Sequence, residues 1–163
     1  MDLAIISDTH MPRGGRRLPE PCITRLRTAD LIVHAGDLIA MEVLRDLEAL
    51  GPPVAAVHGN VDGADLRTVL PAERMVEAEG ARIAVLHDAG PAPGRMERMR
   101  RRFPDADAVV FGHSHLPLHE TGPDGQQLFN PGSPTERRRA PAHTMGSARA
   151  EDGTIAFELI TLP

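Results

Sequence analysis

Five apolar runs of the chain each end at side chains that can bind a metal ion. These side chains are Asp8 and His10, Asp37, Asn60, His87, and the pair His113 and His115. In open α/β sheets, ligands collect beyond the carboxyl ends of the strands, where the backbone directs side chains into a common crevice. One such residue would be an ordinary turn or surface side chain, but five successive strand ends are hard to explain by packing. The sequence therefore predicts a metal site at the strand ends.

The types of these side chains indicate which metals they would hold. The set contains two carboxylates, four imidazoles and one amide oxygen, with no thiolate. Mixed nitrogen and oxygen ligation suits divalent Mn, Fe, Zn, Co or Ni. Seven ligands exceed what one tetrahedral ion needs, but they suit two adjacent ions if one carboxylate bridges them. Two ions roughly 3.5–4 Å apart form a clamp for in-line displacement at phosphorus, so we expect phosphoester chemistry.

The elements that must position these ligands follow from the hydrophobic pattern. We expect strands at 3–7, 30–34, 54–58, 74–79, 82–86, 108–111, 118–121, 127–129, 144–150 and 155–162, and helices at 20–28, 41–50 and 95–103. The first half alternates strand and helix, whereas the second half is mostly strand. Two packed sheets flanked by helices explain both halves, so we expect an α/β (α+β) fold in a single domain spanning residues 1–163.

Composition narrows the possible partners. The net charge is −5, and the aromatic residues are four Phe with no Trp or Tyr, so no stable nucleic-acid partner is expected. The single cysteine, Cys22, excludes an internal disulfide and a cysteine-based zinc site. The N-terminal apolar run is too short for a signal peptide, and no run approaches the roughly twenty apolar residues of a membrane span. A cytoplasmic location and no membrane partner are therefore expected.

The order Asp-x-His, Gly-Asp, Gly-Asn, His, Gly-His-x-His resembles that of the calcineurin-like metallophosphoesterases, most closely their small single-domain, YfcE-like phosphodiesterase branch. The resemblance covers nearly the whole chain and includes the stretch Phe129-Asn130-Pro131-Gly132-Ser133, which we expect to shape the site. It implies a four-layer αββα sandwich of two mixed sheets, with the metal site at the carboxyl ends of the strands.

The resemblance also implies a role for each ligand. One metal would be held by Asp8, His10, Asp37 and His115, and the other by Asp37, Asn60, His87 and His113, with Asp37 bridging. The expected cofactors are two divalent ions, Mn before Fe, Zn, Ni or Co. A hydroxide bridging the two ions would attack a phosphodiester, or as a second choice a small phosphomonoester.

Two positions depart from the pattern of that family. Many members carry His directly after the Asn, where this chain has Val61, and the residue after His87 is Asp88 where Gly is usual. With Val61 present, protonation of the leaving group falls to water, Asp62 or another His. We therefore assign catalytic roles to Asn60 and Asp62, and we expect Arg13 to contact the phosphate because it lies close to His10 in sequence.

Other interpretations remain open. Metal-assisted hydrolysis at carbon, as in metallo-β-lactamase-like enzymes, would need an early His-x-His-x-Asp-His cluster that the chain lacks. A non-catalytic scaffold is the main alternative, because a eukaryotic retromer subunit uses this fold for protein contacts with an incomplete metal site. All seven ligands are present here, which favours the enzyme. The expected partner is a small phosphoester substrate, with a homo-oligomer as a further possibility.

The remaining basic residues carry weaker signals. His34 is a candidate to support the ligands, and His58 could face either way, whereas His119 and His143 are expected at the surface or on an edge strand. Arginines cluster around positions 13–17, 98–102 and 137–139. Such clusters are usually solvated surface, and the alternative is that one of them faces an anionic substrate.

Overall fold

The computed structural model describes residues 1–163 and contains two five-stranded mixed sheets. The first sheet has the order β10-β9-β1-β2-β3 and consists of β1 (Asp2–Ile6), β2 (Leu31–His34), β3 (Val54–Ala56), β9 (His143–Glu151) and β10 (Thr154–Leu162). The second has the order β4-β5-β6-β8-β7 and consists of β4 (Glu73–Ala78), β5 (Ala81–Leu86), β6 (Ala108–Val110), β7 (Leu118–Thr121) and β8 (Gln127–Asn130).

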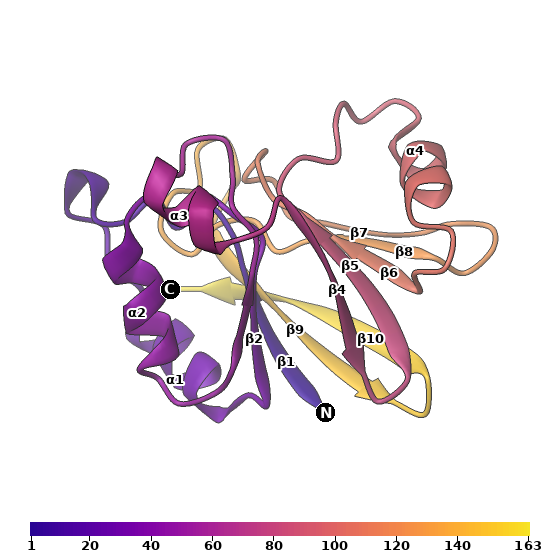
Figure 1. Cartoon of the computed structure of the whole chain (residues 1–163), viewed down its shortest axis with the longest axis horizontal. Coiled ribbons are helices and arrows are strands. Elements are labelled where there is room, and N and C mark those ends of the chain that lie inside the picture. Colours follow the sequence, from indigo (N-terminus) through magenta and orange to yellow (C-terminus); the bar gives the residue numbers. More distant parts are fainter.

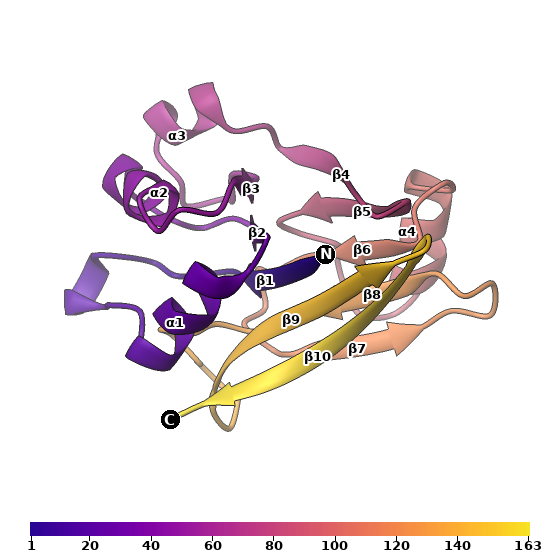
Figure 2. The same ribbon diagram turned by 90° about the horizontal axis from the view of Figure 1, so that it is seen from below.

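Helices cover the outer faces of both sheets, which confirms the four-layer αββα sandwich (Figures 1 and 2). The first sheet carries α1 (Glu20–Thr28), α2 (Met41–Glu48) and α3 (Ala64–Val69), and the second carries α4 (Arg95–Arg102). The sequence pattern did not predict α3, because a six-residue helix that buries only Leu66 has too few turns to show periodicity. None of the helices has the length and apolar character needed to span a membrane.

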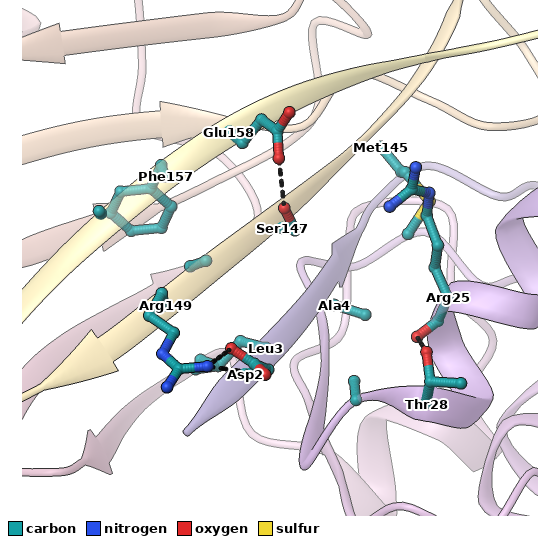
Figure 3. Close-up of a pocket in the computed structure, with 13 residues that line it drawn as sticks. Asp2, Leu3, Ala4, Arg25, Thr28, Met145, Ser147, Arg149, Phe157 and Glu158 are labelled. Atoms are coloured by element: carbon teal, nitrogen blue, oxygen red, sulfur yellow. Dashed lines mark hydrogen bonds and ion pairs between the residues drawn. The ribbon is translucent and has the colours of Figure 1, made fainter.

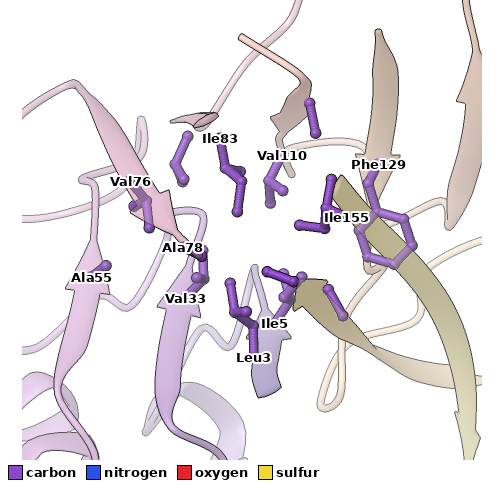
Figure 4. Close-up of a cluster of buried hydrophobic side chains, with 14 of the residues drawn as sticks. Leu3, Ile5, Val33, Ala55, Val76, Ala78, Ile83, Val110, Phe129 and Ile155 are labelled. Carbon is purple, nitrogen blue, oxygen red and sulfur yellow. The ribbon is translucent and has the colours of Figure 1, made fainter. Parts of the chain in front are cut away.

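The main core lies between the two sheets. Figure 4 shows Leu3, Ile5 and Val33 of the first sheet among side chains of the second, such as Val110 and Phe129. Side chains alternate along a strand, so the intervening residues of β1 point the other way and pack under the helices. A strand buried on both faces has to be apolar throughout, which is the reason for the continuous apolar runs in the sequence.

The strand directions bring the predicted ligand loops to one end of the sandwich. In the first sheet β1, β2 and β3 are parallel, and in the second β5, β6 and β8 are parallel. Their carboxyl ends lead into the loops at the top of Figure 1. The expected strands at 74–79 and 82–86 form an antiparallel hairpin, β4 and β5, with Glu79 (φ 47°) and Gly80 (φ 84°) in the left-handed conformations that a tight hairpin turn requires.

A groove of about 450 Å³ lies between α1 and the outer face of β1, β9 and β10 (Figure 3). Its polar contacts are internal, since Arg149 pairs with Asp2 at 3.0 Å and Ser147 donates to Glu158 at 3.4 Å. Asp2 begins β1, whereas the ligand Asp8 follows the end of that strand. The groove is therefore separate from the predicted metal site.

Candidate metal centre

The loops that follow five strands bring all seven predicted ligands into one cluster. Asp37 lies between two imidazoles, because its Oδ2 is 3.2 Å from Nε2 of both His10 and His87. Oδ1 of Asp8 is 3.3 Å from Nε2 of His115. The sequence therefore identified the residues that meet here, although they come from positions spread over more than half of the chain.

The two remaining ligands complete the cluster at its exposed rim. Oδ1 of Asn60 is 3.0 Å from Nε2 of His87 and also 3.0 Å from Nδ1 of His113. Both Asn60 and His113 are exposed, whereas the other five ligands are buried. One side of the cluster is thus enclosed by protein, and the side formed by Asn60 and His113 is open to solvent.

Three of the imidazoles are anchored through one ring nitrogen and present the other to the carboxylates. Nδ1 of His87 donates to the backbone oxygen of Ala35 at 2.8 Å, and Nδ1 of His115 donates to the backbone oxygen of Glu136. Nδ1 of His10 lies 2.9 Å from the Glu136 carboxylate. Anchoring of this kind fixes the tautomer and leaves Nε2 free as a metal ligand.

The chemistry of the cluster fits bound divalent cations. Oδ1 of Asp8 and Nε2 of His115 are buried, and neither forms a hydrogen bond. Burying such polar atoms without partners is costly, and a cation between them would satisfy both. Groups of three side chains with donor atoms within 4.8 Å of one another occur twice, as Asp8–His10–His115 and as Asp8–Asp37–His87. The donors are nitrogen and oxygen only, as Mn, Fe, Zn, Co or Ni prefer.

Both acidic ligands remain ionised despite their burial. Burial raises the pKa of Asp8 and of Asp37, but their interactions with the neighbouring imidazoles lower both pKa values below the ordinary range. For Asp8, a hydrogen bond from Ser7 at 2.6 Å adds to this effect. Two carboxylates that stay negative in a buried site attract cations.

The backbone of the ligand loops is strained in the same way at five of the seven ligands. Positive φ values occur at Asp8 (54°), His10 (48°), Asp37 (62°), His113 (67°) and His115 (59°). A side chain in the left-handed region costs of order 1–3 kcal/mol and persists only where the surroundings impose it, as they do at functional sites. The fold therefore imposes the directions of these side chains.

Glycines before the ligands allow the loops to approach one another. A Cβ at Gly59 would lie 2.0 Å from Oδ1 of Asp37, and one at Gly112 would lie 1.9 Å from the hydroxyl oxygen of Ser7. The Gly-Asn and Gly-His pairs of the sequence are thus required by contacts between loops. These contacts join segments far apart in the chain, and the sequence alone does not show them.

Asp62 holds two ligand loops together. Its carboxylate accepts backbone N–H groups from Asp37 at 3.0 Å, Ile39 at 2.6 Å and Gly59 at 2.6 Å. Through these contacts Asp62 positions the loops that carry Asp37 and Asn60. The catalytic role that we assigned to Asp62 from the sequence stays a prediction.

The stretch from Asn130 to Ser133 supports the loops as expected. Ser133 donates its hydroxyl to the backbone oxygen of Asp8 at 2.8 Å, and Asn130 donates its amide to the backbone oxygen of Gly112 at 2.9 Å. Each contact fixes the backbone next to a ligand, and neither side chain joins the ligand cluster.

The predicted phosphate contact, Arg13, lies in an exposed 3-10 turn (Arg13–Gly15) where its guanidinium forms no hydrogen bond or ion pair. Another arginine contacts the backbone of a ligand. Nη1 of Arg138 is 3.5 Å from the backbone oxygen of His113, and the side chain is 47% exposed. The arginine cluster at 137–139 therefore borders the rim of the site.

The other histidines lie outside the ligand cluster. His119 is exposed on the edge strand β7 and bonds Gln127 at 2.8 Å, and His143 begins β9. His58 borders a cavity of about 250 Å³ that also reaches Asn60 and His87. His34 is fully buried behind the site, where Nδ1 accepts the N–H of Gly36 at 3.2 Å and Nε2 contacts the hydroxyl of Thr9 at 3.1 Å.

Burial makes His34 a source of pH-dependent stability. Desolvation lowers the pKa of His34 from 6.5 to about 4, with partial opposition from Asp62 and Asp8. The unfolded chain takes up this proton first as the pH falls, so the native state loses stability between pH 6.5 and about 4. This loss reaches roughly 3 kcal/mol at most.

A His34→Asn variant tests this expectation, since Asn keeps a donor and an acceptor but does not titrate. In metal-free protein, the difference in unfolding free energy between wild type and variant should narrow as the pH falls from 6.5 to 4. Denaturant titrations at several pH values measure it. Parallel pH dependences for the two proteins would contradict this expectation, because they would mean that His34 takes up its proton at the same pH in the native and unfolded states.

The fold and the ligand cluster are those of a metallophosphoesterase-type sandwich, and comparison with known sequences agrees. The sequence profile of the calcineurin-like phosphoesterase superfamily domain matches residues 1–153. A "probable metallophosphoesterase" of Methanothermobacter thermautotrophicus is 36% identical over 140 residues, covering 85% of this chain and 80% of that protein. The chain belongs to the calcineurin-like phosphoesterase superfamily.

Solved structures share the same fold. Vps29 of Entamoeba histolytica, solved in complex with zinc, superposes with a TM-score of 0.78 at 21% identity and covers 99% of each chain. A structure described as a novel archaeal phosphodiesterase has a TM-score of 0.72 at 21% identity, covering 98% of this chain and 100% of that one. At these identities the likeness establishes the architecture.

Proposed function

We propose that the protein is a metal-dependent phosphodiesterase that uses two divalent ions, Mn²⁺ first among them. The observation that carries this proposal is the convergence of seven nitrogen and oxygen ligands, with Oδ2 of Asp37 3.2 Å from an imidazole on each side. In this assignment Asp8, His10, Asp37 and His115 hold one ion. Asp37, Asn60, His87 and His113 hold the other.

The bound ions would neutralise the anionic phosphoester and supply a hydroxide nucleophile near neutral pH. The chain's own residues then define how the substrate approaches. The buried ligands close one side of the cluster, so the phosphate enters past Asn60 and His113 at the exposed rim. Arg138 beside that rim can hold a phosphate oxygen, and this position suits the contact better than that of Arg13.

A scaffold of the same fold is the competing proposal, because Vps29 proteins share this architecture. The complete set of seven ligands favours the enzyme. The deciding experiment is a hydrolysis assay of Mn²⁺-loaded protein on a panel of aryl and alkyl phosphodiesters and monoesters, with His115→Ala as the inactive control. Turnover that His115→Ala removes supports the enzyme. Metal binding without turnover on any phosphoester would favour the scaffold.

A further inference from the structure

Glu136 lies behind the ligand cluster and contacts two ligands of the same proposed metal. Its carboxylate oxygen Oε2 is 2.9 Å from Nδ1 of His10, and its backbone oxygen accepts the Nδ1 proton of His115. The hydroxyl of Ser133 accepts the backbone N–H of Glu136 at 2.9 Å and fixes the turn that presents it. Sequence reasoning gave Glu136 no role.

An arginine from a distant part of the chain holds this carboxylate in place. Nη2 of Arg16 is 2.6 Å from Oε1 of Glu136, and the two side chains are 23% and 24% exposed. The pair is thus partly shielded from water. In such surroundings a charged hydrogen bond is stronger than at the surface. Arg16 also donates through Nη1 to the backbone oxygen of Arg13 at 2.8 Å, so the 3-10 turn packs against the same ion pair.

We infer that Glu136 is a positioning residue for the metal ligand His10 and that Arg16 holds Glu136 for this task; the inference rests on the proposed two-metal function. A carboxylate at Nδ1 keeps the proton on that nitrogen, so that Nε2 faces Asp37 as a free lone pair. It also makes the imidazole a stronger electron donor to a metal. The contact is short but is not aligned as a full hydrogen bond, so its charge carries the effect.

The geometry makes the effect specific to one of the two metals. Glu136 contacts His10 and His115, which both belong to the enclosed metal position. His87, on the other metal, is anchored separately by the backbone oxygen of Ala35. Removing the Glu136 charge should therefore weaken the binding of one ion and leave the binding of the other unchanged.

The test is a calorimetric Mn²⁺ titration of metal-free wild type, Glu136→Gln and Glu136→Ala. Loss of such a supporting carboxylate typically costs about 10- to 100-fold in metal affinity. We expect a loss of this size at one of the two binding steps, and a change of no more than about threefold at the other. Glu136→Gln keeps the side-chain volume, so it remains informative if Glu136→Ala does not fold.

Two further variants separate charge from structure. Arg16→Gln should weaken the same step, whereas Arg16→Lys, which keeps a positive charge, should weaken it less. Glu120→Gln, an exposed glutamate on β7, is the matched control and should bind both ions as wild type does. Equal weakening of both steps, or wild-type affinities in Glu136→Gln, would overturn the inference. Wild type that binds no Mn²⁺ would instead overturn the proposed function and, with it, this role.

Discussion

Replacing Asp37 by Ala should remove both metal ions and all measurable hydrolysis. Oδ2 of Asp37 lies 3.2 Å from Nε2 of His10 and of His87, which are proposed ligands of different metals. This one oxygen is therefore next to both proposed metal positions. The other oxygen of Asp37 accepts the backbone N–H of Val61 at 3.0 Å, which fixes the orientation of the carboxylate. Without it, each metal position loses a negative ligand at the same time.

Metal content per chain and kcat in Mn²⁺ measure this result. Asp105→Ala is a suitable control, because Asp105 is an exposed aspartate (73%) whose nearest basic partner, Arg82, is 3.8 Å away. That variant should retain two ions and wild-type turnover. Two ions per chain retained in Asp37→Ala would rule out Asp37 as the bridging ligand. A loss in His119→Ala comparable to that in His115→Ala would mean that the ligand set itself is wrong.

Introducing a histidine at Val61 should change which substrates are cleaved. A general acid contributes typically about 10²–10⁴-fold, and it matters most when the leaving alkoxide is strongly basic. We expect wild type to cleave an activated aryl diester far faster than an alkyl monoester. Val61→His should raise kcat/KM mainly for the alkyl substrate, by up to about the factor a general acid supplies.

The contacts around Val61 support this expectation, and they show which neighbouring carboxylate is already engaged. Val61 is half-buried, and its N–H bonds the Asp37 carboxylate, so a side chain here is next to the ligands. Asp62 follows Val61 in the chain and is the nearest carboxylate in sequence that could orient the new imidazole. Both oxygens of Asp62 already accept backbone N–H groups, three in all, so that carboxylate is committed to the loops.

The measurement compares kcat/KM for the two substrates in wild type, Val61→His and Val61→Leu. The leucine variant changes the size of the side chain without adding an acid, so it should keep the wild-type ratio. If wild type prefers the alkyl monoester, or if Val61→His leaves the ratio unchanged, another group already supplies the proton. His58 would then be tested first, since it borders the same cavity as Asn60 and His87.

The four layers and the convergence of the seven candidate ligands could be predicted because their signals are local in the sequence. Each buried strand is a continuous apolar run, and each run ends at a residue whose donor atoms stand out, such as Asp8 or His87. The carboxyl ends of parallel strands lie at one edge of a sheet. The residue types at these strand ends were therefore enough to predict that the candidate ligands lie close together.

The residues that support the ligands could not be predicted, because their contacts join distant segments. Arg16 and Glu136 are 120 positions apart, and each alone is an ordinary surface residue type. The same holds for Gly112, where a side chain would clash with Ser7. Only the folded loops show which charges and glycines the site requires.

The most direct test of the account is a crystal structure of the Mn²⁺-loaded protein with anomalous scattering measured for Mn. We expect two anomalous peaks roughly 3.5–4 Å apart, the spacing of two-metal phosphoesterase sites. Asp37 should contact both, His10 and His115 one, and His87 and His113 the other. A single peak, or two peaks without Asp37 between them, would contradict the proposed dinuclear centre.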